Sequence, residues 1–229
     1  MRMWQTIRTP AIGRHSHEDA YAALVLSGGY EEAGDHGRFL VRAGDVVLHD
    51  RFEAHLDRFS ALGAVLLNLR LTIGHSFRPG IARVADPDFI VRAAEISQAE
   101  AADLLLSTVQ VQGSKCADWP DELAAALGQN PSLRLLQWGE KKGLAPWTIS
   151  RGFSQVFGVP PEAFRARTRA RHAWTAIRYT QEPLAKIAAH LGFADQPHMT
   201  RSVKQLTGMG PMKWRTAANG FKTQAQAGM

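Results

Sequence analysis

The chain has 229 residues, of which 45% are hydrophobic and 21% are charged, and its net charge is +6. This composition excludes a disordered protein and suffices for one large or two ordinary domains. No apolar run approaches the roughly 20 residues that cross a bilayer, so no membrane partner is expected. The single cysteine, Cys116, excludes an internal disulfide and favours a cytoplasmic protein.

The charge is unevenly distributed along the chain. Residues 1–112 hold 11 arginines and 14 acidic residues, a net charge of −3. Residues 113–229 hold 16 lysines and arginines against 7 acidic residues, a net charge of +9. This asymmetry predicts that the C-terminal half binds a polyanion and that the N-terminal half does not.

Residues 1–80 carry short apolar runs separated by glycine and acidic turns, a pattern that is typical of antiparallel strands. The runs are AYAALVLSGGYEE, GRFLVRAGDVVLHD and ALGAVLLNLRLTI. The pattern resembles the small β-barrel of the cupins, which encloses a pocket between two sheets. This resemblance implies a β-rich, cupin-like barrel whose pocket senses an effector.

Three histidines and one tyrosine are the candidate pocket residues of this barrel. His15 and His17 form an H-x-H pair, and His55 follows forty residues after His15. Metal-binding cupins add a glutamate a few residues after the pair, but Tyr21 or Ala22 stands there. We therefore expect His15, His17, Tyr21 and His55 to line an effector pocket, without a resident metal or other cofactor. Zinc binding by the three histidines, as in a metal-dependent cupin enzyme that carries a DNA-binding domain, is the alternative.

Residues 81–112 have a helical pattern. We expect the helices to cover the barrel or to form a contact between two chains. A loosely continuous apolar side is predicted to contain Phe89, Ala93, Ile96, Leu104 and Val111. Residues 113–120 then read as a linker, and residues 218–229 as a frayed tail.

Residues 121–217 contain one unit twice. The segment that begins at Leu135 repeats in the segment that begins at Leu184, and Arg151 corresponds to Arg201 at a spacing of 50. Each unit reads as a helix, a tight turn and a second helix. This arrangement is typical of the helix-turn-helix unit.

The turn of the second unit has clear local signals. A stripe of apolar residues ends at Gly192, Asp195 is placed to cap the next helix, and Pro197 falls in its first turn. Gly139 and Ala188 occupy equivalent positions where a small side chain lets the paired helices approach. The predicted buried faces of the two second helices are Ile149, Phe153 and Val156 in the first unit and Met199, Val203 and Leu206 in the second.

The outward faces of these second helices carry hydrogen-bond donors. In a helix-turn-helix unit the second helix enters the major groove of DNA. Arginine bonds guanine at two points and glutamine does so with adenine, whereas hydroxyls and the tryptophan N–H suit phosphate. The predicted DNA-binding residues are Trp147, Thr148, Ser150 and Arg151 in the first unit and Gln196, His198, Thr200, Arg201 and Lys204 in the second.

The connector between the units, residues 161–180, reads as one helix. Twenty residues at about 1.5 Å each span about 30 Å, close to the roughly 34 Å of one DNA turn. Such a rod would hold two reading helices in successive grooves. Its arginines, several of which we expect near phosphates, are Arg165, Arg167, Arg169, Arg171 and Arg178.

Residues 118–217 resemble the AraC/XylS family of bacterial transcription regulators. The most specific part is PLAKIAAHLGFADQPHMTRSVKQLTGMGPMKWR, and GLAPWTISRGFSQVFGVPPEAF also matches. Val203 departs from the family pattern, which usually has phenylalanine there. The resemblance implies an α+β chain in which a cupin-like barrel precedes an all-α domain with two helix-turn-helix units. It also implies a regulator without enzymatic activity whose partners are double-stranded DNA, a small-molecule effector, RNA polymerase and, through residues 81–112, a second copy.

Overall fold

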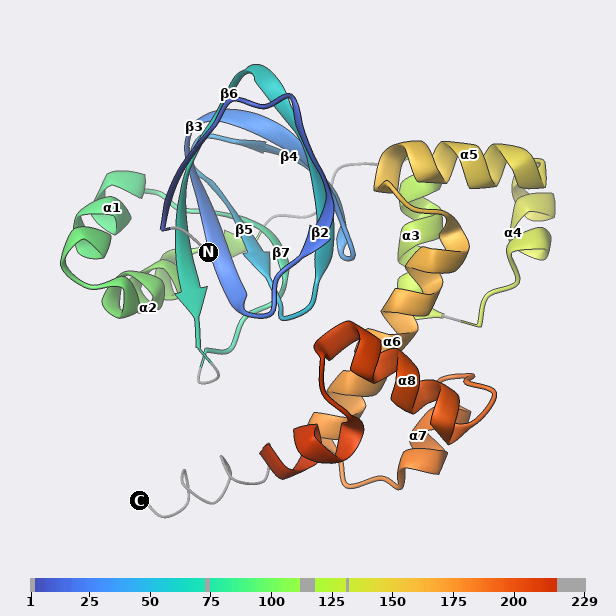
Figure 1. The fold of residues 1–229 in the computed structure, drawn as a ribbon. Helices are drawn as coiled ribbons and strands as arrows, with labels where there is room; N and C mark the ends of the chain where they lie inside the picture. Colours follow the sequence, from blue (N-terminus) through green and yellow to red (C-terminus); the bar gives the residue numbers. More distant parts are fainter. Residues whose placement is uncertain (1–2, 73–74, 112–117, 131, 218–229) are drawn as a thin grey trace. The chain divides into compact units, whose positions relative to one another are not determined.

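The computed structural model describes residues 3–72, 75–111, 118–130 and 132–217. Within these ranges an antiparallel sheet is followed by a series of helices (Figure 1). The chain divides into two compact units, residues 1–125 with 151–159 and residues 126–150 with 160–229. Most of the predicted linker, including Cys116, and all of the predicted tail lie outside the described residues. No described helix has the length and apolar character that crossing a membrane requires.

The strands predicted in residues 1–80 are present and belong to one sheet. Its main path has the order β1-β6-β3-β5-β7-β8, with β2 added to β6 and β4 added to β3, and every pairing is antiparallel. The described strands are β1 (Trp4–Ile7), β2 (Ala11–Ser16), β3 (Ala20–Gly34), β4 (Gly37–Arg42), β5 (Asp45–His49), β6 (Ala54–Leu71), β7 (Gly80–Arg83) and β8 (Gln110–Val111).

The pairing of β3 with β6 organises the sheet, and Figure 1 shows these two long strands running side by side. Its register shifts twice, between Val25 and Ser27 and between Gly28 and Tyr30. Gly28 has a φ of +73°, and a Cβ atom there would lie 2.0 Å from the carbonyl oxygen of Gly63. Only glycine fits such a close approach of two backbones, so this residue fixes where the strands bend.

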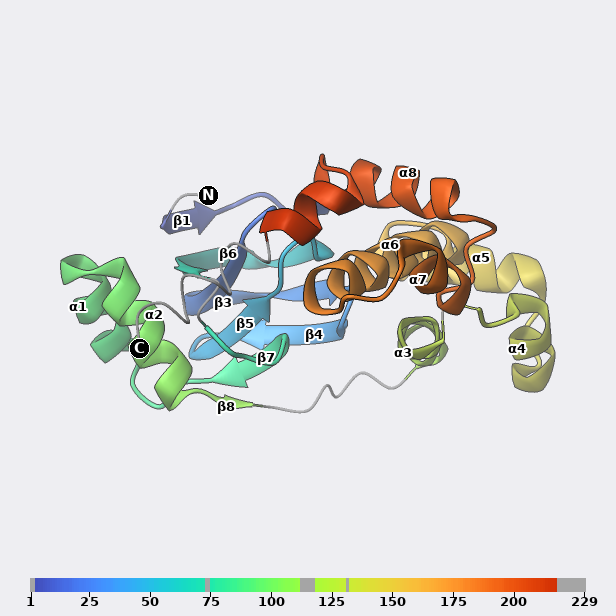
Figure 2. The ribbon, with the colours of Figure 1, turned by 90° about the horizontal axis from the view of Figure 1, so that it is seen from below.

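Two helices, α1 (Pro87–Ile96) and α2 (Gln98–Thr108), pack against the sheet (Figures 1 and 2). The predicted continuous apolar side is wrong, because Phe89 and Ile96 are 49% and 85% exposed while Ile90 and Ala94 are buried. Ser97 explains the difference. Its extended backbone ends α1, and its hydroxyl caps α2, so the two helices do not share one continuous face.

The rest of the described chain is helical, and the two predicted helix pairs and the helix between them are present. The pairs are α4–α5 and α7–α8, and α6 connects them. The helices after the sheet are α3 (Trp119–Gln129), α4 (Leu135–Lys142), α5 (Pro146–Phe157), α6 (Pro161–Tyr179), α7 (Leu184–His190) and α8 (Gln196–Thr207).

Candidate functional site

The turn between α7 and α8 has the predicted caps. Gly192 follows α7 with a φ of +70°, a conformation that glycine adopts without a steric cost. The Asp195 carboxylate accepts a hydrogen bond of 2.6 Å from the backbone N–H of His198, and Pro197 lies in the first turn of α8. The sequence signals at this turn are therefore confirmed.

The inner face of α8 anchors the helix. Met199 and Val203 are fully buried as predicted, whereas Leu206 is half-buried and Thr207 takes the last inward position. The Thr207 hydroxyl donates to the carbonyl oxygen of Val203 at 2.8 Å and accepts from the indole N–H of Trp214 at 2.8 Å. Because these groups are buried, the hydrogen bonds fix the C-terminal end of α8.

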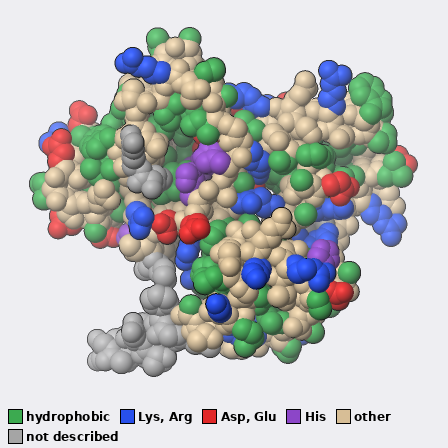
Figure 3. Space-filling view, viewed as in Figure 1, with side chains coloured by type: hydrophobic (Ala, Val, Ile, Leu, Met, Phe, Trp, Pro, Cys, Tyr) green, Lys and Arg blue, Asp and Glu red, His purple; other side chains and the backbone are tan. Residues whose placement is uncertain are grey.

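The outer face of α8 presents the predicted donors to solvent. Gln196, His198, Arg201 and Lys204 are exposed, and Thr200 is half-buried. Lysine and arginine side chains recur on the surface of the helical part in Figure 3. A helix with one face fixed in the core and the other covered with donors can meet the edges of bases without rearranging its backbone.

The pair α4–α5 is held by a close helix contact. A Cβ atom at Gly139 would lie 2.5 Å from Cδ1 of Ile149 and 3.0 Å from the carbonyl oxygen of Leu144. The predicted need for a small side chain at this position is therefore confirmed. Ile149 and Phe153 are buried as predicted, whereas Val156 is half-buried.

The outer face of α5 carries the other predicted DNA-binding residues. Trp147 is 69% exposed, an unusual exposure for so large an apolar ring. Ser150 and Arg151 are also exposed, and Thr148 is half-buried. The arginine therefore lies on the exposed face in both second helices, as the repeat predicts.

The arginines of α6 differ from the prediction. Arg171 and Arg178 are each only 8% exposed. The guanidinium of Arg178 lies 4.9 Å from the ring centre of Trp174 and 5.7 Å from that of Trp214, a cation–π arrangement inside the core. Arg169 donates to the carbonyl oxygen of Gly192 at 3.0 Å. Arg169 and Arg178 thus make contacts within the fold, and Arg171 is buried. The expectation that the arginines of α6 lie near phosphates is therefore wrong for Arg171 and Arg178.

The sheet brings the predicted pocket residues together. His15 on β2 lies opposite His55 on β6, and their ring centres are 4.4 Å apart. The ring of His17 lies 4.9 Å from those of both His15 and Tyr21. The four side chains line one cavity of about 80 Å³, and histidine side chains gather in a patch on this part of the surface in Figure 3.

The cluster also contains polar residues that the sequence analysis did not predict. Buried His49 stacks on Tyr21 with ring centres 4.4 Å apart, and buried Glu32 lies 3.3 Å from Nδ1 of His55. Asp57 lies opposite Glu32 across the β3–β6 pairing. The available signals were the run VVLH, which ends a buried strand with a histidine, and the two adjacent glutamates in GYEEAG.

The cluster shifts the pKa values of its members. Burial, with a further effect of His55, lowers the pKa of His17 to about 4. Burial alone would raise the pKa of Glu32, but the adjacent His49 and His55 bring it below its usual range. Burial raises the pKa of Asp57 to about 6, although His55 acts in the opposite direction. At neutral pH the cluster thus combines an ionised carboxylate with a neutral imidazole at His17.

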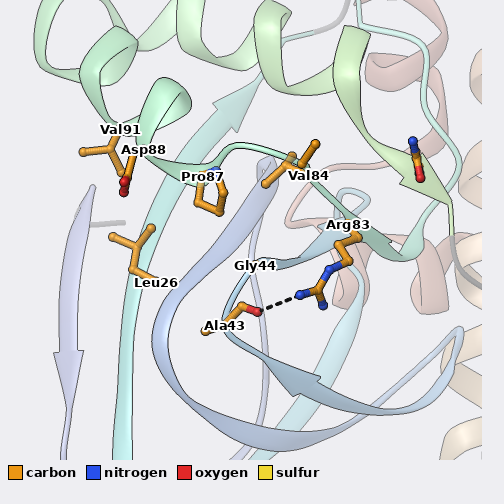
Figure 4. A pocket seen from close by; sticks show the side chains of 10 residues that line it. Leu26, Ala43, Gly44, Arg83, Val84, Pro87, Asp88 and Val91 are labelled. Carbon is orange, nitrogen blue, oxygen red and sulfur yellow. Dashed lines mark hydrogen bonds between the residues drawn. The ribbon is translucent and has the colours of Figure 1, made fainter.

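A larger cavity, of about 570 Å³, lies where α1 meets the sheet (Figure 4). Its polar lining includes Arg83, whose guanidinium donates to the Asp45 carboxylate at 2.6 Å and to the carbonyl oxygen of Ala43 at 3.4 Å. Leu26 and Val91 supply apolar surface. Its volume lies within the roughly 300–1,000 Å³ of ordinary ligand pockets, whereas the histidine cavity is too small for such a ligand.

Known proteins match either the C-terminal part of the chain or most of its length. A helix-turn-helix domain family matches residues 138–217, and no curated protein matches the chain. A solved structure of a probable AraC family transcriptional regulator from Rhodopseudomonas palustris CGA009 is 21% identical over 42% of this chain and 93% of that chain, with a TM-score of 0.39.

Two further solved structures are similar to this chain. The DNA-binding domain of AdpA, in complex with a target DNA, is 18% identical over 47% of this chain and 99% of that chain, with a TM-score of 0.43. ToxT from Vibrio cholerae strain SCE256, bound to an unsaturated fatty acid, is 11% identical over 90% of this chain and 89% of that chain, with a TM-score of 0.43. These low TM-scores carry no functional argument. The family match and the two helix pairs, however, identify a helix-turn-helix domain in residues 138–217.

Proposed function

We propose that the chain is a cytoplasmic, sequence-specific DNA-binding transcription regulator whose N-terminal part binds a regulatory ligand. One observation carries the DNA-binding part. The chain contains two helix-turn-helix pairs, and the second helix of each exposes an arginine at the same place, Arg151 in α5 and Arg201 in α8. A net charge of +9 on residues 113–229 supports binding to the phosphate backbone.

The exposed side chains divide by their chemistry into reading and positioning groups. Arg201 suits a two-point contact with guanine and Gln196 one with adenine. Lys204 and the hydroxyl of Thr200 suit phosphates, which fix the position of the protein without selecting a sequence. The 19 residues of α6 span about 28 Å at about 1.5 Å per residue. In our proposal this length holds α5 and α8 for successive major grooves, which lie about 34 Å apart.

The N-terminal part supplies the regulatory input. A small-molecule effector of ordinary size fits the 570 Å³ cavity beside Arg83 better than the 80 Å³ histidine cavity. An effector changes DNA binding only if it binds two states of the chain with different affinity. Filling the larger cavity with Val91→Trp is therefore expected to abolish a response to such an effector and to leave basal DNA binding unchanged.

A homodimer and contact with RNA polymerase complete the proposal. Support for a dimer comes from α1, where Phe89 and Ile96 expose large apolar side chains on the same side of one helix, about two turns apart. A single charged substitution, Ile96→Glu, is expected to shift a dimer to monomers in analytical ultracentrifugation. An unchanged sedimentation coefficient would contradict a contact through this face.

The DNA-binding proposal is tested with duplexes that the full chain selects from a random pool. Fluorescence anisotropy then compares Arg201→Ala on the selected duplex and on an unrelated duplex. Loss of a two-point base contact costs about 1–3 kcal/mol, so affinity for the selected duplex should fall about 5- to 150-fold. Affinity for the unrelated duplex should change little.

Lys204→Ala is the matched control on the same helix. Because a phosphate contact is independent of sequence, this substitution should weaken binding to both duplexes equally. Equal losses on both duplexes for Arg201→Ala would contradict the proposed reading role, as would a pool from which no preferred sequence emerges.

A further inference from the structure

Three buried side chains in the N-terminal unit have the arrangement of a metal site. Glu32, His49 and His55 each offer one ligand atom, and these atoms lie within 4.8 Å of one another. These three residues are 0%, 2% and 4% exposed. They come from β3, β5 and β6, and β3 pairs with both of the other strands.

The buried carboxylate of Glu32 requires compensation for its charge. Its nearest polar neighbours are Nε2 of His49 and Nδ1 of His55, at 3.4 Å and 3.3 Å from the same oxygen, Oε2. Charge-assisted hydrogen bonds between nitrogen and oxygen are shorter, about 2.7–2.9 Å. Among the described residues neither oxygen of Glu32 has a partner in hydrogen-bond geometry. The three groups therefore converge without satisfying one another.

The two distances agree with ligands that share an ion. Nitrogen and oxygen ligands bind Zn²⁺ at about 2.0–2.2 Å, so two ligands of a tetrahedral ion lie about 3.4 Å apart. The separations of Glu32 from His49 and His55 match that spacing. Two histidines and one carboxylate are also an established donor set for divalent zinc and iron.

The surroundings of the three groups orient them as outer partners do in metal sites. Tyr21 stacks on His49 with an angle of 18° between the rings, and its hydroxyl lies 3.3 Å from Nε2 of His55. The 80 Å³ cavity, which His49 and His55 also line, leaves room for water as a further ligand.

We propose that Glu32, His49 and His55 bind one divalent first-row transition-metal ion, with a further coordination position open to the cavity. The sequence led us to expect no metal and, in the alternative, a site made of His15, His17 and His55. One ligand atom from each of those three histidines also lies within 4.8 Å of the others, but His15 and His17 are only half-buried. The buried set is favoured because it includes a carboxylate that offsets the charge of the ion.

Isothermal titration of the metal-stripped full chain with Zn²⁺ tests the site. One ion is expected per chain. Loss of an outer partner costs about 10- to 100-fold in metal affinity, so loss of a ligand in Glu32→Gln or His49→Gln should cost at least about 100-fold. His190→Gln, on the exposed face of α7, is the matched control and should bind Zn²⁺ as the unchanged chain does. His15→Gln should weaken binding less than tenfold.

The proposal would be overturned if Glu32→Gln and His49→Gln both bound Zn²⁺ as tightly as the unchanged chain. It would also be overturned if only substitutions of His15 and His17 weakened Zn²⁺ binding. The unchanged chain provides a test that does not depend on the folding of any variant. Bound Co²⁺ should show the visible absorption of a site with nitrogen and oxygen ligands, and its absence would also refute the site. A regulatory role for the ion rests on the proposed function, but the titration contains no DNA, so the two can fail separately.

Discussion

The buried hydrogen bond between Thr207 and Trp214 offers a sharp test of how α8 is fixed. Thr207→Val keeps the shape of the side chain and removes its hydroxyl. Trp214 is only 6% exposed, and its indole N–H then loses the acceptor that lies 2.8 Å away. An orphaned buried donor costs about 1–3 kcal/mol, so we expect the free energy of unfolding to fall by about 2 kcal/mol.

A double-mutant cycle isolates this hydrogen bond from other effects. Trp214→Phe keeps an aromatic ring against Trp174 and removes the N–H donor. In this background Thr207→Val should cost about 1–2 kcal/mol less than in the unchanged chain, because no donor is left without a partner. Thr207→Ser keeps the hydroxyl and serves as the control, with a cost of about 1 kcal/mol for the lost methyl group.

The assay is urea unfolding of the full chain followed by far-ultraviolet circular dichroism. With an m-value near 2 kcal/mol per molar urea, a loss of 2 kcal/mol lowers the midpoint by about 1 M. The m-value itself should not change. If Thr207→Val costs as much in the Trp214→Phe background as in the unchanged chain, the role assigned to the hydrogen bond is refuted.

Three further predictions concern the helical part. Asp195→Ala should destabilise the chain by about 1 kcal/mol through loss of the cap, and Asp195→Asn by only a few tenths, as urea midpoints would show. Gly139→Val should cost about 1–3 kcal/mol because its side chain overlaps Ile149, and Ile149→Val should recover part of that loss in the double variant. Burial and Arg171 lower the pKa of His172, so the unfolded chain binds a proton more readily than the folded chain. This contribution to stability is complete above pH 6.5 and is lost as the pH falls below it. His172→Gln should therefore make the free energy of unfolding depend less on pH below 6.5. An unchanged pH dependence would contradict the lowered pKa of His172.

The sequence predicted those features that depend on local rules. Gly192, Asp195 and Pro197 lie within six residues, and each acts through the backbone next to it, so their roles could be read without a structure. The need for a small residue at Gly139 followed from the repeat, because Ala188 stands at the equivalent place.

Features that depend on long-range packing were not predicted. Glu32 and His49 join His55 only because β3 pairs with both β5 and β6 in a particular register. On α6, Arg178 looks like any exposed cation in the sequence, and its burial depends on Trp214, which lies 36 positions further along the chain. The apolar side of residues 81–112 was misplaced because Ser97 reads equally well inside a helix and at a cap.

The spacing of the bound DNA elements tests the central claim most directly. Inserting five base pairs between the two halves of the selected duplex turns them to opposite faces of the double helix, and α6 is one continuous helix that cannot follow. We predict that anisotropy will show a fall in affinity toward that of an unrelated duplex, since only one of the two helices can still read its half, and that ten inserted base pairs will not restore it. Unchanged affinity after either insertion would contradict the claim that one chain reads two successive grooves.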